Sequence, residues 1–426
     1  MRSPPFYKLL TLILCVVGAV TRPAIAVDIH RPDVKSFIDE VSGKDSISKR
    51  QLRKLLRAAK SQPAIIEAMD RPAEKAKPWY EYRPIFLTER RIREGTEFWI
   101  AHRQELDRAS IKSGVAPEYL AAIVGVETYY GRLAGSYRVL DALTTLAFDY
   151  PARAKFFRDE LEQFILLARD IGFDPLVVKG SYAGAMGAPQ FMPSNYRRYA
   201  VDANADGHID LWNNWSDVCA SVGNYLKEHG WNAGEPVLSE AAVDAGRTAD
   251  LDGRKLALAD TVESLKAKGV TFDSSLPPDA PALLIAADES DGVHWRVGYN
   301  NFYVITRYNH SALYAMAVYE LAAAVKQRVL LHDAAAVGAP APAPAAATPA
   351  TTATPDPEIP ATAAPATATP ATATPATATP ASARPVTATR GPAALAATTR
   401  GSAAPSPATP GASAAANEMP QASSPP

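Results

Sequence analysis

Hydrophobic side chains recur three or four residues apart through most of residues 28–337, which is the spacing of one face of an α-helix. Thr88 suits the N-cap of a long amphipathic helix that runs towards Lys112, with Phe98 and Leu106 on its apolar side. The same spacing predicts further helices over residues 141–146, 151–170, 216–229 and 310–329. The pattern therefore indicates a mainly helical protein.

Strand-like runs are fewer and gather late in the chain. Strands are expected at Ala282–Ile285, His294–Val297 and Phe302–Ile305, where β-branched and aromatic residues are enriched. The expected fold class is mainly α (α+β). Its parts are a helical core at about residues 88–232, a small mixed α/β subdomain at about residues 233–300, and a C-terminal helix over residues 310–329.

The composition changes abruptly at about residue 338. Ala, Pro, Thr and Ser dominate from there on, and a five-residue repeat places prolines at Pro365, Pro370, Pro375 and Pro380. Such a segment has little to bury and too many prolines for regular structure, so residues 338–426 are expected to be a disordered tail. A tether or a binding strip for envelope proteins is the alternative.

The first 26 residues have the parts of a secretory signal. Positive charge comes first, the apolar run Leu9–Val20 follows, and Ala24–Ala26 ends in a small-x-small cleavage site. The run is too short to span a membrane comfortably. We expect cleavage after Ala26 and export to the periplasm. An outer-membrane lipoprotein lipidated at Cys15 is disfavoured, because Leu14 precedes that cysteine rather than a small residue.

The chain has 44 Lys and Arg residues against 45 Asp and Glu residues, a net charge of -1. This balance gives no electrostatic case for nucleic acid or for an anionic membrane surface. Removal of the signal would leave Cys219 as the single cysteine, so an internal disulfide is excluded and the hydrophobic core must supply the stability.

One expected helix combines an apolar pattern with a single acid near its end. Pro117 suits its first turn, Gly131 is placed to end it, and Glu127 shares a face with Leu120 and Ile123. Apolar neighbours and the negative end of the helix dipole both disfavour an ionised carboxylate. A carboxyl group held neutral in this way can act as a general acid. A solvated surface glutamate is the alternative, and the apolar run weighs against it.

A glycine-rich segment lies at residues 180–194. Its glycines at 184 and 187 permit positive φ and close backbone approach. Gln190 offers an amide that both donates and accepts, and Phe191 and Met192 offer an apolar wall. This mixture suits a groove for a sugar with acetamido groups. Taken alone, the segment is more simply explained as a tight turn packed by Phe and Met.

Residues 202–210 follow the calcium-loop pattern, in which oxygen ligands recur at every second position around a glycine. The predicted ligands of a structural Ca²⁺ are the side chains of Asp202, Asn204 and Asp206, the carbonyl of His208, and Asp217. The twelfth position of the loop is Asn213 instead of a bidentate glutamate, so Asp217 completes the shell only if the chain curls back. An acid-rich surface turn is the alternative.

Aromatic and amide side chains are interleaved over residues 299–310. Sugar faces stack on aromatic rings and sugar hydroxyls bond to amides, so Asn301, Tyr303 and Tyr308 are candidates for a sugar groove, together with Tyr129. Aromatic residues of a strand packed in the core explain the same pattern equally well.

Taken in this order, four motifs resemble the membrane-bound lytic murein transglycosylase B family, a lysozyme-like group that acts on peptidoglycan. They span most of residues 28–330 and are specific in combination. The motifs are IVGVETYYG at residues 123–131, SYAGAMGAPQFMPS at 181–194, DGHIDLW at 206–212 and NFYVITRYNH at 301–310.

The resemblance implies a lysozyme-like helical catalytic core with Glu127 as the single catalytic carboxyl. In such enzymes the carboxyl protonates the oxygen that joins N-acetylmuramic acid to N-acetylglucosamine, and it then accepts a proton from the muramoyl C6 hydroxyl. That hydroxyl attacks C1 and leaves a 1,6-anhydro end. The resemblance also implies glycan binding by Ser181, Gln190 and the region of Tyr303 and Tyr308, and calcium binding by the acidic loop.

Two other functions stay open. A lysozyme that hydrolyses the same bond needs a second carboxylate near the sugar, and neither the Glu127 helix nor the glycine-rich segment offers an obvious one. A non-catalytic scaffold would keep the groove and recruit partners through the tail. The expected partners are peptidoglycan glycan strands, with envelope proteins on the tail, and no nucleic acid.

Overall fold

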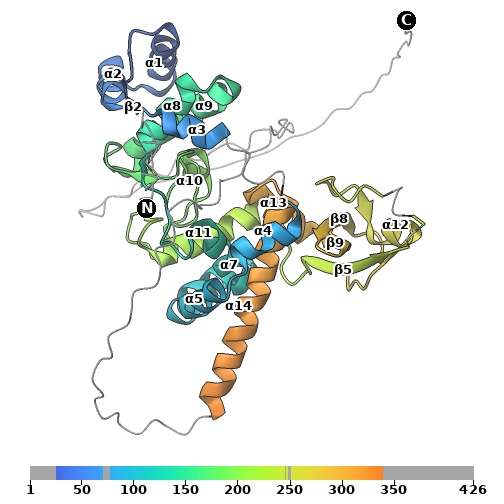
Figure 1. Ribbon diagram of the computed structural model, residues 1–426. Helices are drawn as coiled ribbons and strands as arrows, with labels where there is room; N and C mark the ends of the chain where they lie inside the picture. The colour runs from blue at the N-terminus through green and yellow to red at the C-terminus, as the bar shows by residue number, and fades with distance from the viewer. Residues whose placement is uncertain (1–24, 71–76, 245, 248–250, 339–426) are drawn as a thin grey trace, which may run out of the picture. The chain divides into compact units, whose positions relative to one another are not determined.

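The computed structural model describes residues 25–70, 77–244, 246–247 and 251–338 (Figure 1). The expected leader up to residue 24 and the expected tail from residue 339 lie outside the described residues. The helices are α1 Pro32–Asp45, α2 Lys49–Ala58, α3 Pro63–Asp70, α4 Trp79–Phe86, α5 Glu89–Ala101, α6 Arg103–Ser113, α7 Pro117–Thr128, α8 Val139–Asp149, η1 Pro151–Arg153, α9 Ala154–Ile171, α10 Pro193–Tyr199, α11 Trp215–Glu228, α12 Val262–Ala267, α13 Asn300–Tyr308 and α14 Ala312–Gly338.

The predicted fold class, mainly helical with a small α/β part, is confirmed. Where the sequence predicts one helix from Thr88 to Lys112, the structure has two, α5 and α6. Thr88 is the N-cap as expected, since its hydroxyl accepts the N–H of Arg91 at 3.1 Å. His102 interrupts the helix with φ -116° and ψ 28°, and its ring packs between Phe98 and Trp215.

The strand predicted at Phe302–Ile305 is wrong. These residues lie in α13, whose N-cap is Tyr299. The helix buries Phe302, Val304 and Ile305 together and packs on α14 and β9. Tertiary packing has overridden the β-propensity of this run, as it often does for short apolar segments.

A single sheet forms the small subdomain, with strand order β6-β8-β9-β5-β7 and every pair antiparallel (Figure 1). Alternate residues of β8 face opposite sides. Leu283 and Ile285 join the large helical core, whereas Leu284 packs with Leu265 of α12 in a second, smaller core. The strands of this sheet are β5 Leu238–Val243, β6 Asp260–Thr261, β7 Val270–Thr271, β8 Pro281–Glu289 and β9 Gly292–Tyr299.

Two short ladders tie the helices together. Strands β1 (Ile25–Ala26) and β2 (Lys60–Ser61) pair, and so do β3 (Tyr137–Arg138) and β4 (Lys179–Gly180). The predicted cleavage point falls directly after β1. The second ladder starts the glycine-rich segment.

Helix α14 packs along α7, α5 and α4. It extends nine residues beyond the predicted end at residue 329. Ala315, Val318, Ala322 and Val325 follow helical spacing and are all buried. Because two of these residues are alanines, α14 can lie close to its neighbours. Across the described part of the chain, no helix has the length and apolar character that crossing a membrane requires.

Candidate active site

Glu127 is the penultimate residue of α7, and its side chain is 3% exposed. Leu120 and Ile123, which share its face, are fully buried. Hydrophobic residues occupy every side of this helix, so α7 runs through the core and carries the carboxyl group with it. The predicted apolar setting of Glu127 is therefore present in the structure.

The helix ends before Gly131, where the sequence placed its end. Tyr129 and Tyr130 already adopt left-handed backbone, with φ 52° and 59°, ahead of Gly131 at φ 84°. The N–H of Tyr130 donates to the carbonyl of Val124, six residues back, at 3.2 Å, and this bond closes the turn. Left-handed backbone costs a non-glycine residue about 1–2 kcal/mol. Two such residues directly after Glu127 form a turn that surrounding contacts must hold.

Two contacts hold this turn. The ring of Tyr130 lies against Gly125, where a Cβ would come within 2.6 Å of the ring. The hydroxyl of Thr128 donates to the carbonyl of Ala188 at 2.8 Å. The second contact joins the end of α7 to the glycine-rich segment, so the two motifs found in the sequence meet beside the acid.

Tyr314 of α14 donates its hydroxyl to Oε1 of Glu127 at 2.6 Å. The tyrosine is 1% exposed. Burial and then the negative charge of Glu127 raise the pKa of Tyr314 well above its usual value, so the phenol keeps its proton. Tyr314 is not among the residues that the sequence pattern singles out. Its only signal was a phenol in an alanine-rich helical stretch.

Tyr308 of α13 and Tyr225 of α11 also lie within the electrostatic reach of Glu127. Burial is the main cause that raises the pKa of each phenol, and the charge of Glu127 adds to it. The Tyr308 hydroxyl donates to the carbonyl of Pro189 at 2.7 Å. The ring centroids of Tyr225 and Tyr308 are 4.8 Å apart, so the two aromatic side chains form one wall.

Glu127 is the single carboxylate among the charges that raise the pKa values of Tyr225, Tyr308 and Tyr314 within the described residues. An aspartate or glutamate placed close beside these phenols would act on them in the same way. Around Tyr129 and Tyr130, directly after α7, burial raises the pKa of both phenols, and the charge of Glu94 acts in this way and raises it further.

The glycine-rich segment folds back on itself through single bridges that join Met186 to both Gly180 and Phe191. The Ser181 hydroxyl accepts the N–H groups of Ala183 and Ala185 at 3.3 and 3.1 Å. Ser181, which the sequence predicts as a sugar contact, caps this turn in the structure. Its side chain is 5% exposed.

Gln190 has left-handed backbone, φ 52°. Its amide N–H₂ donates to the carbonyls of Gly187 and Ala134 at 2.9 and 3.2 Å. These bonds fix the side chain between two loops. They use the amide nitrogen, so the amide oxygen takes no part in them. Phe191 lies 5.9 Å from Tyr308, centroid to centroid, which connects the segment to the tyrosine wall.

Among the predicted sugar contacts, Met192, Tyr303 and Tyr129 are half-buried. The guanidinium of Arg91 lies 4.6 Å from the centre of the Tyr129 ring. Asn301 is placed differently. It is fully buried on α13, and its amide bonds the N–H and carbonyl of Asn232 and one further carbonyl. This position favours a structural role for Asn301 over contact with a sugar.

Four of the predicted calcium ligands lie in the loop between α10 and α11, and the fifth, Asp217, lies in the first turn of α11. Oδ2 of Asp202 accepts the N–H of Gly207 at 2.9 Å, and Oδ1 of Asp206 accepts that of His208 at 2.8 Å. Asn204 donates its amide to Asp206 at 2.7 Å. Gly207, at φ 86°, makes the sharp turn that the pattern requires.

Asp217 curls back to this loop, as the sequence analysis required. It is fully buried, and its two oxygens accept the N–H groups of Ala203 and Asp210, both at 2.9 Å. Burial raises its pKa, and the charges of Asp202 and Asp206 raise it further. These three acids therefore repel one another, which a hard cation would relieve. Three or more His, Cys, Asp or Glu side chains do not come together in a metal-holding arrangement within the described residues, so carbonyl and amide oxygens would have to complete the shell.

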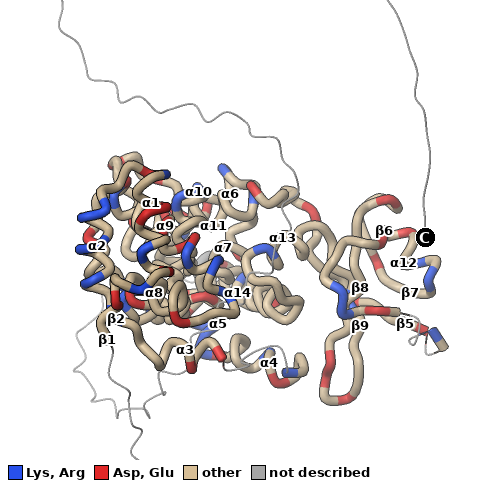
Figure 2. The backbone as a smooth tube through the Cα atoms, turned by 90° about the horizontal axis from the view of Figure 1, so that it is seen from above, with Lys and Arg blue, Asp and Glu red and all other residues tan. Residues whose placement is uncertain are grey.

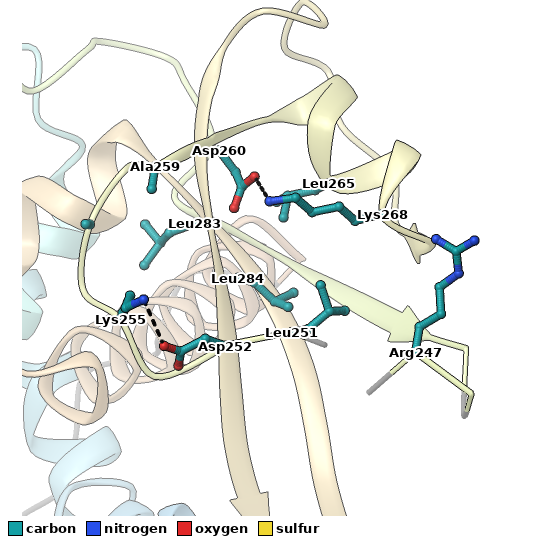
Figure 3. Close-up of a pocket in the computed structure, with 11 residues that line it drawn as sticks. Arg247, Leu251, Asp252, Lys255, Ala259, Asp260, Leu265, Lys268, Leu283 and Leu284 are labelled. Atoms are coloured by element: carbon teal, nitrogen blue, oxygen red, sulfur yellow. Dashed lines mark hydrogen bonds and ion pairs between the residues drawn. The ribbon is translucent and has the colours of Figure 1, made fainter. Parts of the chain in front are cut away.

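A hollow of about 390 Å³ lies in the sheet subdomain, lined by leucines and by charged residues (Figure 3). Two ion pairs occupy its rim, Lys268 with Asp260 at 2.5 Å and Lys255 with Asp252 at 3.4 Å. None of the predicted site residues lines it. The candidate site is therefore the surroundings of Glu127, where two of the motifs meet, rather than this hollow.

Known proteins are similar to most of this chain. The profile of a family described as transglycosylase SLT domain matches residues 30–323. The chain is 42% identical over 306 residues to membrane-bound lytic murein transglycosylase B of Escherichia coli (strain K12), which covers 70% of this chain and 83% of that protein.

Solved structures are similar over the same region. The soluble lytic transglycosylase SltB1 of Pseudomonas aeruginosa is 46% identical with a TM-score of 0.67, covering 70% of this chain and 99% of that one. The Escherichia coli lytic transglycosylase Slt35, solved in complex with calcium, is 41% identical with a TM-score of 0.66, covering 72% and 97%.

The chain belongs to the transglycosylase SLT family. Within that family it is a lytic murein transglycosylase of the membrane-bound B and Slt35 type, an enzyme that acts on peptidoglycan. The fold and the activity that the four motifs implied are both confirmed.

Proposed function

We propose that Glu127 carries out both proton transfers of the transglycosylase reaction. As a neutral acid it protonates the glycosidic oxygen between N-acetylmuramic acid and N-acetylglucosamine. As a carboxylate it then accepts the proton of the muramoyl C6 hydroxyl while that oxygen bonds to C1, so the 1,6-anhydro ring closes without water. The observation that carries this proposal is one buried carboxyl group, bonded to Tyr314, beside the buried phenol of Tyr308.

Tyr314 orients the acid. Its phenol keeps a proton and donates to one carboxyl oxygen, which fixes the plane of the group. A hydrogen bond donated to a carboxylate also stabilises the charged form, which the second proton transfer uses. Burial in the core of α7 favours the neutral form, which the first transfer uses.

The sugar groove would lie between the glycine-rich segment and the tyrosine wall. Gln190 and Tyr308 border this space, and their amide oxygen and ring face suit acetamido and sugar surfaces. Phe191 is 1% exposed and packs against Tyr308 within the core, so it would support the groove from behind. Met192 and Tyr129, both half-buried, would extend the apolar surface. Tyr303 and Ser181 would line the edges of this groove.

The acidic loop would hold a structural Ca²⁺. Its ligands would be the side chains of Asp202, Asn204, Asp206 and Asp217 and the carbonyl of His208. The three carboxylates do not form a metal-holding group within the described residues, so they would draw together as the ion binds. The donors are hard oxygens, the kind that calcium prefers. A bound ion would neutralise the carboxylates and fix the loop that follows α10, whereas the proton transfers would stay with Glu127.

The enzyme would work in the periplasm after export and cleavage behind Ala26, where peptidoglycan is within reach. Peptidoglycan glycan strands are its substrate. The sequence from residue 338 on would supply reach or contacts to envelope proteins.

The Glu127→Gln variant tests the role of the acid. Gln keeps the size of the side chain but cannot transfer the proton, so the variant should still bind purified sacculi and should release no muropeptides. The matched control is Glu118→Gln, which changes a second buried glutamate of the same helix, paired with Lys326 at 2.7 Å. The control should keep activity. Release of muropeptides by the Glu127→Gln variant would exclude this carboxyl group as the acid.

A further inference from the structure

Three arginines, Arg90, Arg91 and Arg132, gather beside Tyr129, which follows the last residue of α7. The guanidinium of Arg91 lies 4.6 Å and that of Arg132 lies 5.9 Å from the centre of the Tyr129 ring. Arg90 pairs with Glu94 at 2.9 Å, and the same carboxylate also pairs with Arg132. We call the three arginines the arginine cluster.

The arginine cluster has an excess of positive charge. Figure 2 shows basic and acidic residues mixed over the helical part of the chain, in keeping with its net charge of -1. In the cluster, three cations share one carboxylate, which leaves two positive charges. Arg90 and Arg132 place their charges at the surface, since each side chain is 54% exposed. Burial and the charge of Glu94 raise the pKa of Tyr129, and the charges of all three arginines oppose that rise.

Arg91 is the buried member of the cluster. It is 7% exposed, and its guanidinium lies against the rings of Phe86 and Tyr129. Within the described residues, no group accepts a hydrogen bond from its buried Nε or Nη1. Burial lowers the pKa of Arg91, but an arginine keeps its proton in a protein. A buried cation with unsatisfied donors is costly to a fold, so its retention beside Glu127 points to a use for its charge.

The position of the cluster indicates which anion it attracts. Tyr129 is half-buried and lies two residues after Glu127, so an anion at the cluster would lie beside the glycan at the candidate site. The sugars of peptidoglycan are uncharged, whereas the peptide stems on its muramic acid residues carry free carboxylates. An extended stem spans about 3.3–3.6 Å per residue, so a few residues bridge the gap between the sugar and the cluster. Guanidinium groups suit carboxylates, since they offer paired N–H donors.

We propose that the arginine cluster binds a carboxylate of the stem peptide on the glycan strand that Glu127 cleaves. This inference rests on the proposed function of Glu127. Arg90 and Arg132 would contact the carboxylate with their exposed guanidinium groups. Arg91 would add positive potential from beneath the Tyr129 ring, where burial weakens the screening by water. The enzyme would therefore prefer glycan strands that carry charged stems.

Cleavage of three soluble glycan substrates by the full chain tests this. The first carries its stem peptides, the second carries stems whose carboxylates have been converted to neutral amides, and the third has no stems. The test variants are Arg132→Gln, at an exposed position, and Arg91→Met, which keeps a long side chain without its charge. The control is Arg93→Gln, which removes one charge from an exposed position on the same helix, α5.

The wild type and the control should cleave the first substrate with a kcat/KM about 3- to 10-fold above that for the other two, the range expected for one ion pair with a carboxylate. Each test variant should bring this ratio towards one, mainly through KM. Rising salt should lower the ratio of the wild type, because it screens exposed charges. If Arg91→Met does not fold, Arg132→Gln decides the outcome.

Two results would overturn the proposal. One is a wild type that cleaves the amidated strands as well as the charged ones. The other is a test variant at Arg132 that keeps the wild-type ratio, or that loses activity on all three substrates alike, because the arginines would then support the turn after α7 without binding a ligand. The proposed function fails separately, through a Glu127→Gln variant that still releases muropeptides. If the ratio alone failed, Glu127 would remain the proposed acid.

Discussion

Glu127 and Tyr314 are 187 positions apart in the chain, yet their side chains meet at hydrogen-bonding distance. They meet because α7 and α14 pack along each other. The sequence singled out Glu127 as a candidate, since an acid that directly follows an apolar run within a helix is unusual at any single position. The sequence could not identify Tyr314. The hydrophobic pattern of a helix shows which residues are buried, but not which of them contacts an acid on another helix.

We predict that Tyr314→Phe lowers kcat about 10- to 100-fold with little change in KM. The variant loses one hydrogen bond to a charged group, worth about 1.5–3 kcal/mol, and keeps the packing of the ring. The control is Tyr225→Phe, whose hydroxyl donates to the carbonyl of Arg307 and not to Glu127. Steady-state kinetics on soluble glycan would separate them. If Tyr314→Phe retained the full kcat, the phenol would have no role in orienting the acid.

At the scale of elements, periodicity predicted the helices α5 to α9, α11 and α14, with differences of up to nine residues at their ends, and it missed α1 to α4, α10, α12 and α13. It failed where tertiary contacts decide. The run Phe302–Ile305 has the composition of a strand and folds as part of α13, because packing on α14 buries it better that way. The break at His102 was also invisible, since the apolar spacing continues across it and only the aromatic contacts of that ring mark it.

We expect Gly187→Ala to destabilise the glycine-rich segment and to reduce activity. Gly187 has φ 69°, and a Cβ would come within 2.5 Å of the Leu211 carbonyl. Gly172→Ala is the matched control: its φ is 77°, and nothing lies within 4 Å of the added Cβ. In the control, the free energy of unfolding should fall only by the cost of placing alanine in left-handed backbone, about 1–2 kcal/mol. Urea unfolding should show a larger loss of unfolding free energy for Gly187→Ala than for Gly172→Ala. Equal losses would mean that the glycine-rich segment accommodates the added Cβ without strain.

At the scale of the whole molecule, the candidate site is complete only when helices that are far apart in the sequence pack together. The sheet subdomain is inserted between α11, which supplies Tyr225, and α13 and α14, which supply Tyr308 and Tyr314. The family profile covers residues 30–323, so it includes all of these elements. The acidic loop directly precedes α11, which makes it a support for the tyrosine wall.

Removal of calcium should therefore reduce the free energy of unfolding strongly and the catalytic rate only in part. For an ion present at 100 times its Kd, the loss is about 2.7 kcal/mol, or roughly 5 °C in Tm or more for a domain of this size. Thermal unfolding with and without a strong chelator measures it, and part of the activity should survive. The Asp202→Asn variant should respond less. A melting curve that the chelator leaves unchanged would refute the calcium site.

The ends of the released glycan fragments test the central claim most directly. Mass analysis of muropeptides from purified sacculi distinguishes an anhydro end from a reducing end by the mass of one water. If Glu127 serves as acid and then as base for the C6 hydroxyl, the wild type will yield 1,6-anhydro ends. Fragments with reducing ends in their place would show that water attacks C1, and the single-carboxyl mechanism would be contradicted.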